Sequence, residues 1–347
     1  MDLRWLDPAD PAPRDLAGAV AVLDAARAVD SPYRLADTVS SVRTRLRHGT
    51  DGEAGAMAVA HDGGRVVGVL EVELPRWDNH HLGSVDVVVD PLRRRQGFGR
   101  QLFAAGTTVL RDDGRRVVVT DGWDAPAATA FAATLGLARV GEEVERRQDV
   151  ATLDPEVLAA LRAQAEPHAS AYRLVRLPTW TPDSRLAELA ALTSVINDAP
   201  TDDLDVEDEV FPPERIRTFE AAQLAHGRRT YRLAAIPRHG GGLVGQTMVA
   251  VDSERPGHGR QYDTSVCREH RGHRLGLLLK LEMLRWLAES EPQLRVLDTW
   301  NAASNQAMIV VNEALGYRVM GRAVLWQRSL DVGGARSQPG SSSDRAG

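Results

Sequence analysis

Two aspartates occupy matching positions in the chain, each three residues before the end of an apolar strand that leads into a basic, glycine-containing turn. Asp86 precedes the turn at residues 94–99, and Asp263 precedes the turn at residues 271–276. An amphipathic helix follows each turn, so backbone N–H groups at the helix start can bind an anion such as pyrophosphate. A nearby carboxylate can accept a proton through a water molecule. The pattern predicts phosphate binding beside acid–base chemistry, in two places.

The two copies keep one register over most of their length. The turns and the aspartates are the same distance apart, since 271 − 94 = 177 and 263 − 86 = 177. A glycine turn that leads into a strand repeats at that offset, ending at Gly68 and Gly245 (245 − 68 = 177). A Leu-Gly pair repeats at nearly the same offset, with Gly136 and Gly316 (316 − 136 = 180). A period this long indicates two domains rather than a solenoid of short repeats.

The elements that must position these residues follow the same order in both units: strand, two helices, several strands, the turn with its helix, then strand, helix and strand. We expect a mixed α/β (α+β) fold with a first domain over 1–150 and a second over 171–330. Asp154 and Pro155 predict the start of a linker helix within 151–170. Residues 331–347 contain almost no large apolar side chain and are predicted to be a disordered tail.

Composition restricts the function classes. The chain of 347 residues has a net charge of −6, which argues against nucleic acid as its partner. It shows no apolar run long enough for a membrane span and no signal-peptide pattern at its start. Cys267 is the only cysteine, which excludes an intramolecular disulfide and a cysteine-rich zinc site and favours a cytoplasmic location. No metal is expected, and the sequence leaves monomer and homodimer open.

The strand, the R-x-x-G-x-G turn (Arg94, Gly97, Gly99) and the later helix that ends in Leu-Gly resemble the GNAT N-acetyltransferases. Two such units in one chain resemble the tandem GNAT proteins of actinobacteria. The resemblance implies, for each domain, a twisted, mostly antiparallel sheet flanked by helices and splayed where two central strands part. It also implies acetyl-CoA as co-substrate and acyl transfer from the thioester to a primary amine of a small molecule.

The same resemblance implies the residues that hold acetyl-CoA. They are the strand ends, the two turns with the first helical residues, and one asparagine before a later helix: Val87, Val89, Arg94, Arg95, Gln96, Gly97, Phe98, Gly99, Arg100, Val266, Arg271, Gly272, His273, Arg274, Leu275, Gly276 and Asn305. The second turn departs from the pattern because Arg274 replaces the first motif glycine. That arginine either crowds the site or adds positive charge for the phosphates.

The later helix distinguishes the two units. Family members often carry an asparagine there that contacts the coenzyme and, seven residues on, a tyrosine that protonates the leaving thiolate. The second unit has Asn305 and Asn312 at these positions, and the first has Ala125 and Ala132. We therefore expect the second unit to be catalytic, with Asp263 and Asn312 as its catalytic residues. The first unit then binds acyl-CoA without catalysis or uses another acceptor.

Several roles stay open at the level of the sequence. The two strand-end aspartates either act as bases through water or pair with an arginine of the turn. A backbone N–H near Val266 or Cys267, or near Val89 in the first copy, is the family's oxyanion donor. The Cys267 side chain is expected to be a small buried hydrophobe rather than a nucleophile. Tyr317 is expected in the core.

An acidic loop between two helices of the second unit bears on the acceptor. Its six carboxylates either attract a cationic amine or form a solvated loop; they are Asp202, Asp203, Asp205, Glu207, Asp208 and Glu209. The alternative to an enzyme is a catalytically inactive acetyl-CoA-binding sensor or structural module, which the missing tyrosine in both copies favours.

Overall fold

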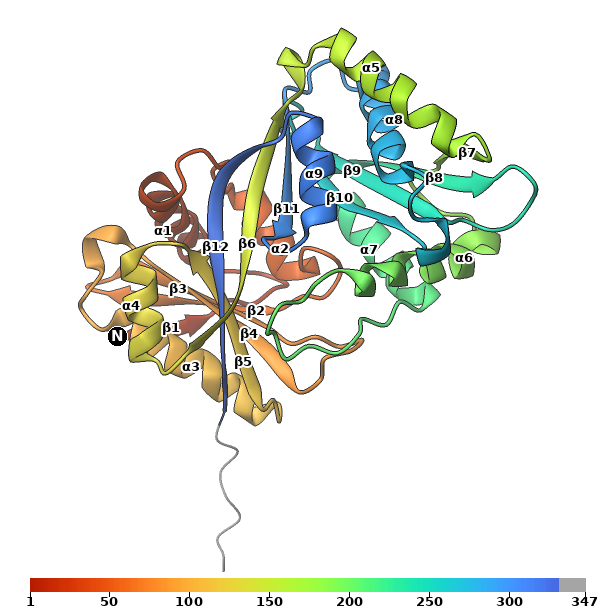
Figure 1. Ribbon diagram of the computed structural model, residues 1–347. Helices are drawn as coiled ribbons and strands as arrows, with labels where there is room; N and C mark the ends of the chain where they lie inside the picture. Colours follow the sequence, from red (N-terminus) through yellow and green to blue (C-terminus); the bar gives the residue numbers. More distant parts are fainter. Residues whose placement is uncertain (331–347) are drawn as a thin grey trace, which may run out of the picture.

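A single sheet of twelve strands runs through both halves of the chain in the computed structural model, which describes residues 1–330 (Figure 1). The strand order is β1-β2-β3-β4-β5-β12-β6-β11-β10-β9-β8-β7. Helices cover the sheet, so the predicted α/β architecture is confirmed. The tail predicted for 331–347 lies outside the described residues.

The first unit contains six strands and four α-helices in the predicted order. They are β1 (Asp2–Trp5), α1 (Pro13–Asp30), α2 (Val39–His48), β2 (Ala56–Asp62), β3 (Arg65–Glu73), β4 (Leu82–Val89), α3 (Phe98–Asp112), β5 (Val117–Trp123), α4 (Pro126–Thr134) and β6 (Ala138–Asp149). A short 3-10 turn, η1 (Pro91–Arg93), precedes α3.

The second unit repeats this order after a connecting helix. Its elements are α5 (Pro155–Ala165), β7 (Tyr172–Leu177), α6 (Asp183–Thr193), η4 (Ser194–Asp198), α7 (Pro213–Ala225), β8 (Arg228–Pro237), β9 (Gly245–Asp252), β10 (His258–Val266), α8 (Leu275–Ser290), β11 (Val296–Ala302), α9 (Gln306–Ala314) and β12 (Arg318–Ser329). The remaining 3-10 turns are η2 (Val150–Thr152), η3 (Glu166–Ala169) and η5 (Arg268–His270).

The linker region forms the predicted helix and joins the core. The Asp154 side chain accepts a hydrogen bond from the Glu156 N–H and caps α5. Leu158 and Leu161 of this helix pack against the core that α8 builds with β8, β9 and β11. The helix is therefore fixed against the second unit rather than free.

Alternation along the strands separates two cores on the two faces of the sheet. In β3, Val69 packs with α1 and α2, whereas Leu70 packs with α3 on the opposite face. Side chains that share the face of Val69 therefore point toward α1 and α2. This alternation decides which polar residues meet at the site.

The two units exchange their last strands. The strand β12, from the end of the second unit, lies between β5 and β6, and β6 pairs with β11 of the second unit (Figure 1). All three contacts at this junction are antiparallel. Each unit's part of the sheet is thus completed by a strand that the other unit supplies.

Two strand pairs part in the way that the family resemblance implied. The strands β4 and β5 pair in parallel only from Leu82 to Ser84, and β10 and β11 pair only from His258 to Arg260. Beyond these residues the two strands of each pair are no longer paired with each other as they continue toward the turn. The aspartates Asp86 and Asp263 lie on the parts that have separated. No helix within residues 1–330 is long and apolar enough to cross a membrane.

Candidate functional site

The two predicted turns have the same backbone shape. Left-handed residues occur at equivalent positions, with φ of 65° at Arg95 and 87° at Gly97 in the first turn and 82° at Gly272 and 54° at Arg274 in the second. The offset is 177 in both cases, since 272 − 95 = 177 and 274 − 97 = 177. Each copy therefore has one glycine and one arginine at these two positions, in opposite order. Arg274 keeps the conformation of the glycine that it replaces.

The first motif arginine holds the turn together in both copies. Arg94 donates from Nε to the carbonyl oxygen of the last residue of β4 (3.3 Å) and from Nη1 to Asp30 Oδ1 (3.0 Å). Arg271 donates to the last carbonyl of β10 (3.0 Å) and to Asp198 Oδ2 (2.6 Å). The partners of the turn arginines are thus the residues at the ends of α1 and η4, not the strand aspartates.

The first residues of the helices that follow the two turns supply unpaired N–H donors. The first helical hydrogen bonds run from the Gln101 N–H to the Gly97 carbonyl and from the Leu278 N–H to the Arg274 carbonyl. The N–H groups of 98–100 and 275–277 therefore have no acceptor in their own helix. Neither helix has an acidic residue in its first turn. This donor set suits a pyrophosphate group.

A cluster of carboxylates surrounds the aspartate of the first unit. Asp86 lies opposite Glu71 in the ladder between β3 and β4. Burial, followed by repulsion from Asp121 and Glu73, raises the pKa of Asp86 well above its usual range. Burial also raises the pKa of Glu73 to about 7. A carboxylate with a raised pKa is a better proton acceptor near neutral pH.

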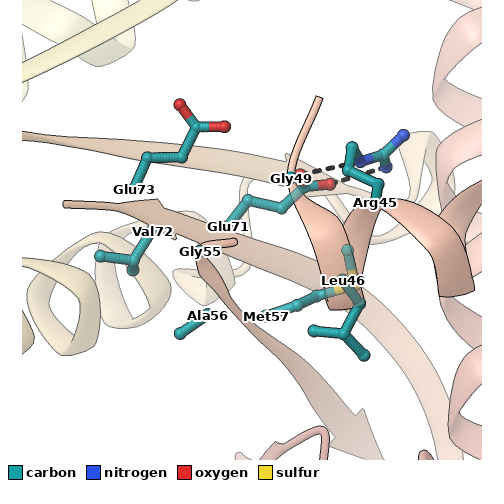
Figure 2. Close-up of a pocket in the computed structure, with 9 residues that line it drawn as sticks. All are labelled: Arg45, Leu46, Gly49, Gly55, Ala56, Met57, Glu71, Val72 and Glu73. Carbon is teal, nitrogen blue, oxygen red and sulfur yellow. Dashed lines mark hydrogen bonds and ion pairs between the residues drawn. The ribbon is translucent and has the colours of Figure 1, made fainter. Parts of the chain in front are cut away.

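Glu71 is the member of the cluster whose charge is balanced. Its Oε1 accepts a hydrogen bond from Arg45 Nη2 at 2.9 Å. Figure 2 shows this pair among the residues that line a small pocket; Glu73 also lines the pocket, and its carboxylate points away from Arg45. Sequence reasoning missed Glu71, Glu73 and Asp121. The alternation of side chains along β3 places Glu71 and Glu73 on the face toward α2, and this pattern could have identified the two glutamates.

The aspartate of the second unit lies in a different environment. The register of β9 and β10 shifts between Gln261 and Thr264, so Asp263 lies in a β-bulge that β4 lacks. Solvent reaches the Asp263 side chain, but burial by the surrounding protein raises its pKa while Arg232 and Arg260 lower it. A bulge interrupts the ladder and leaves local backbone groups without their strand partners.

The carboxylate neighbours have no equivalents in the second unit. Met248 replaces Glu71 and Ala250 replaces Glu73 (248 − 71 = 177, 250 − 73 = 177), and Trp300 replaces Asp121 (300 − 121 = 179). The two strand aspartates therefore differ in charge environment although they share a position.

The asparagines of the later helix are both engaged. Asn305 caps α9, and its Oδ1 accepts from the Met308 N–H at 3.2 Å. Asn312 is fully buried; its Oδ1 accepts from Lys280 Nζ (2.7 Å), and its Nδ2 donates to Asn301 Oδ1 (2.7 Å). Sequence reasoning did not include Lys280.

Cys267 itself does not match the role of oxyanion donor or of nucleophile. The Cys267 N–H donates to the Val244 carbonyl at 2.9 Å, so it is not free for an oxyanion. Burial raises the pKa of the thiol, which opposes nucleophilic activation. Tyr317 lies in the core, 5% exposed, as predicted.

The acidic loop crosses to the first unit. The Glu207 N–H donates to Asn79 Oδ1 (2.7 Å), and the Val210 N–H donates to Asp78 Oδ2 (2.9 Å). Glu209 pairs with Arg215 at 2.9 Å. The loop is thus an ordered contact between the units, and its backbone makes several of the bonds.

The comparisons with known proteins agree with this geometry. The acetyltransferase (GNAT) family profile matches residues 24–137. A mycothiol acetyltransferase of Clavibacter michiganensis subsp. michiganensis is 33% identical over 144 residues, and one of Clavibacter sepedonicus is 37% identical over 151 residues. Each alignment covers 41% of this chain and 43% of the relative, so the chain spans less than half of the length of these relatives.

Solved structures match nearly the whole chain. A tandem GNAT protein from the clavulanic acid biosynthesis pathway is 29% identical with a TM-score of 0.78, over 96% of this chain and 100% of that protein. A GCN5-related N-acetyltransferase of Sphaerobacter thermophilus has the same fold, with a TM-score of 0.67 at 17% identity over 94% of this chain and 95% of that protein. Residues 24–137 thus match the GNAT acetyltransferase family, and the whole chain, with its two matching turns and two splayed strand pairs, has the fold of a tandem GNAT protein.

Proposed function

We propose that the protein transfers an acetyl group from acetyl-CoA to a primary amine of a small molecule. The observation that carries the proposal is the repeated arrangement of a helix start with free N–H groups, a parted strand pair and an aspartate of raised pKa beside it. The helix start suits the pyrophosphate, and the parted strands give the pantetheine arm a strand edge with which to pair. The residues named above from Val87 to Arg100 and from Val266 to Gly276, with Asn305, form the proposed coenzyme site.

We assign the chemistry to the second unit. The register shift at Asp263 leaves residues 262 and 263 outside the regular pairing with β9, and in our proposal a backbone N–H there stabilises the oxyanion of the attacked thioester. Asp263 takes the proton of the attacking amine through water. Asn312 supports the site from within, because both ends of its amide are bonded to Lys280 and Asn301.

We further propose that the acceptor is cationic. The acidic loop of the second unit would attract an ammonium group, and burial raises the pKa of its Glu209, with Asp263 among the charges that add to the shift. The buried carboxylates Asp86, Asp121 and Glu73, whose pKa values are raised mainly by burial, belong to the first unit and would attract an amine only there. The acidic loop adds negative charge where it contacts the first unit.

Thiol release from acetyl-CoA, measured with polyamines and amino sugars, tests the assignment. We expect Asp263→Asn to abolish turnover and Asp86→Asn, the matched change in the first unit, to spare kcat. The reverse result would move the chemistry to the first unit. Acetyl-CoA binding without turnover on any amine would instead support the second candidate, a coenzyme-binding module, which the absence of the family tyrosine at Ala132 and Asn312 favours.

A further inference from the structure

Lysine occurs once in the 347 residues of this chain, and that lysine lies inside the protein. Lys280 is on α8 and is 3% exposed. The other 41 of the 42 lysine and arginine residues are arginine. Arginine stays charged throughout the accessible pH range, whereas a buried lysine can lose its proton. The single use of lysine at a buried position points to a role for a compact, titratable amine.

The amine is the first member of a chain of side chains. Lys280 Nζ donates to Asn312 Oδ1, and Asn312 Nδ2 donates to Asn301 Oδ1, both at 2.7 Å. The ring of Tyr317 faces the amine, with its centroid 4.7 Å from Nζ. Two successive hydrogen bonds thus link three elements, α8, α9 and β11. Hydrogen bonds in such a chain polarise one another, and a charged donor strengthens them.

The chain ends where the sheet parts. Pairing between β10 and β11 stops at Asp298, and Asn301 lies three residues beyond it. By strand alternation Asn301 shares a face with Leu297, which packs against α8, so the amide is on the side of the helix that starts at the second turn. Under the proposed function, the reacting thioester lies at this parting.

The first unit has lost all three members. Phe103 occupies the position of Lys280 (280 − 103 = 177), Ala132 that of Asn312 (312 − 132 = 180) and Gly122 that of Asn301 (301 − 122 = 179). A purely structural need for this network would apply to both copies, because both have the same fold at this point. The network therefore distinguishes the units in function.

We propose that Lys280 is a positioning residue for acyl transfer in the second unit, whose ammonium group orients and polarises the Asn312 and Asn301 amides toward the departing sulfur. The inference rests on the proposed function. In the step, the C–N bond forms as the C–S bond breaks, the electron pair of that bond stays on sulfur, and the proton of the amine passes through water to Asp263. Lys280 keeps its proton and acts through the hydrogen-bonded amides.

The surroundings make this charge dependent on pH. The groups in contact with the amine are the Asn312 amide of α9 and the Tyr317 ring. Asn301 of β11 lies one hydrogen bond further along, and Asp298 of the same strand is bound to Arg147 at 2.6 Å. Burial lowers the pKa of Lys280 from its usual 10.5 to about 7. The fraction of Lys280 in the ammonium form therefore declines as the pH rises through 7. The stabilisation of the departing thiolate that we propose declines with it.

Kinetics of the full chain provide the first test. We expect Lys280→Met to lower kcat by roughly ten- to a hundredfold, the value of one charge-assisted hydrogen bond, with the KM for acetyl-CoA unchanged. The descending limb near pH 7 should disappear. Asn312→Leu should have the same effect, and the double variant should lose no more than either single variant. Phe103→Met, the matched change in the first unit, should leave kcat unaltered. A folded Lys280→Met variant with the original kcat and pH profile would overturn the proposal.

A second measurement needs neither turnover nor a variant. In the chain labelled with 13C-lysine, one side-chain signal reports the pKa of Lys280. Titrations are made with the free protein, with desulfo-CoA and with CoA. We expect a higher pKa with CoA than with desulfo-CoA, because the thiolate stabilises the ammonium through the amides. Equal values overturn the inference. A shift without acetylation of any amine would show that the proposed function fails while the coupling of Lys280 to the sulfur stands.

Discussion

At the motif turns, one left-handed position is filled by glycine in the first copy and by arginine in the second. Gly97 and Arg274 have φ of 87° and 54°. A residue with a Cβ costs about 1–2 kcal/mol in this conformation, while glycine loses about 0.5–1 kcal/mol through its greater freedom in the unfolded chain. The second turn therefore retains the backbone shape of the first at a cost in folding free energy.

We expect Arg274→Gly to raise the free energy of unfolding by about 0.5–1 kcal/mol, since it removes the strain of the left-handed arginine. Urea unfolding measures the change. Gly97→Ala in the first turn is the matched control and should lower the stability by a similar amount. A less stable Arg274→Gly variant would mean that contacts of the arginine side chain outweigh the backbone strain.

The buried amine predicts a pH dependence of stability. Lys280 has a pKa of about 7 in the folded protein and about 10.5 when unfolded. Between these values the unfolded chain binds more protons than the folded chain, so the free energy of unfolding rises with pH by up to about 1.4 kcal/mol per pH unit. Below about pH 7 the lysine is protonated in both the folded and the unfolded chain, so the full cost of burying the ammonium group remains. Lys280→Met removes this contribution. Its excess stability over the natural chain should be largest near pH 7 and shrink toward pH 10 in chemical unfolding, and a constant difference would contradict the assignment.

At the scale of elements, one guanidinium group ties a helix end to a motif turn in each unit. Arg94 connects the end of α1 to the last carbonyl of β4, and Arg271 does the same for η4 and β10. The turn arginines thus fix the turn backbone, and the proposed phosphate binding would depend on them indirectly. The sequence motif does not show this, because Asp30 and Asp198 are distant along the chain from the turns.

We expect Asp30→Asn to weaken acetyl-CoA binding at the first turn by about fivefold or less, the usual value of a surface ion pair, since the turn loses its anchor. Binding at the second turn should not change. Calorimetric titration with acetyl-CoA resolves the two sites if both bind. Asp24→Asn is the control, because Asp24 pairs with Arg27 on the same helix, away from the turn. Equal effects of the two variants would contradict the anchoring role.

For the whole molecule, the exchange of β6 and β12 decides how the halves depend on each other. A fragment of residues 1–153 lacks β12 and β11, the two neighbours of β6, and it exposes the edge of β5. We expect this fragment to aggregate when expressed alone, because unpaired edges associate. Coexpression with residues 154–330 should give a 1:1 complex in size-exclusion chromatography. A soluble, monomeric first fragment would contradict this expectation.

The sequence predicted what local patterns determine. The strand that leads to Asp86, the cap at Asp154 and the helix from Leu275 follow from periodicity and turn chemistry, and all three are present. It did not predict that β12 would pair with β5, because strand alternation does not specify a partner. Nor did it reveal the contacts of Lys280 with Asn312, since residues 32 positions apart meet only through tertiary packing.

The exchanged strands also bear on the history of the duplication. A gene that lost either copy would leave the remaining domain with an open sheet, so neither half can be deleted even if only one performs chemistry. Catalytic groups can then disappear from one copy while its strands must stay. A half that retains its turn and its last strand but has alanine at positions 125 and 132 is what such a constraint would leave behind.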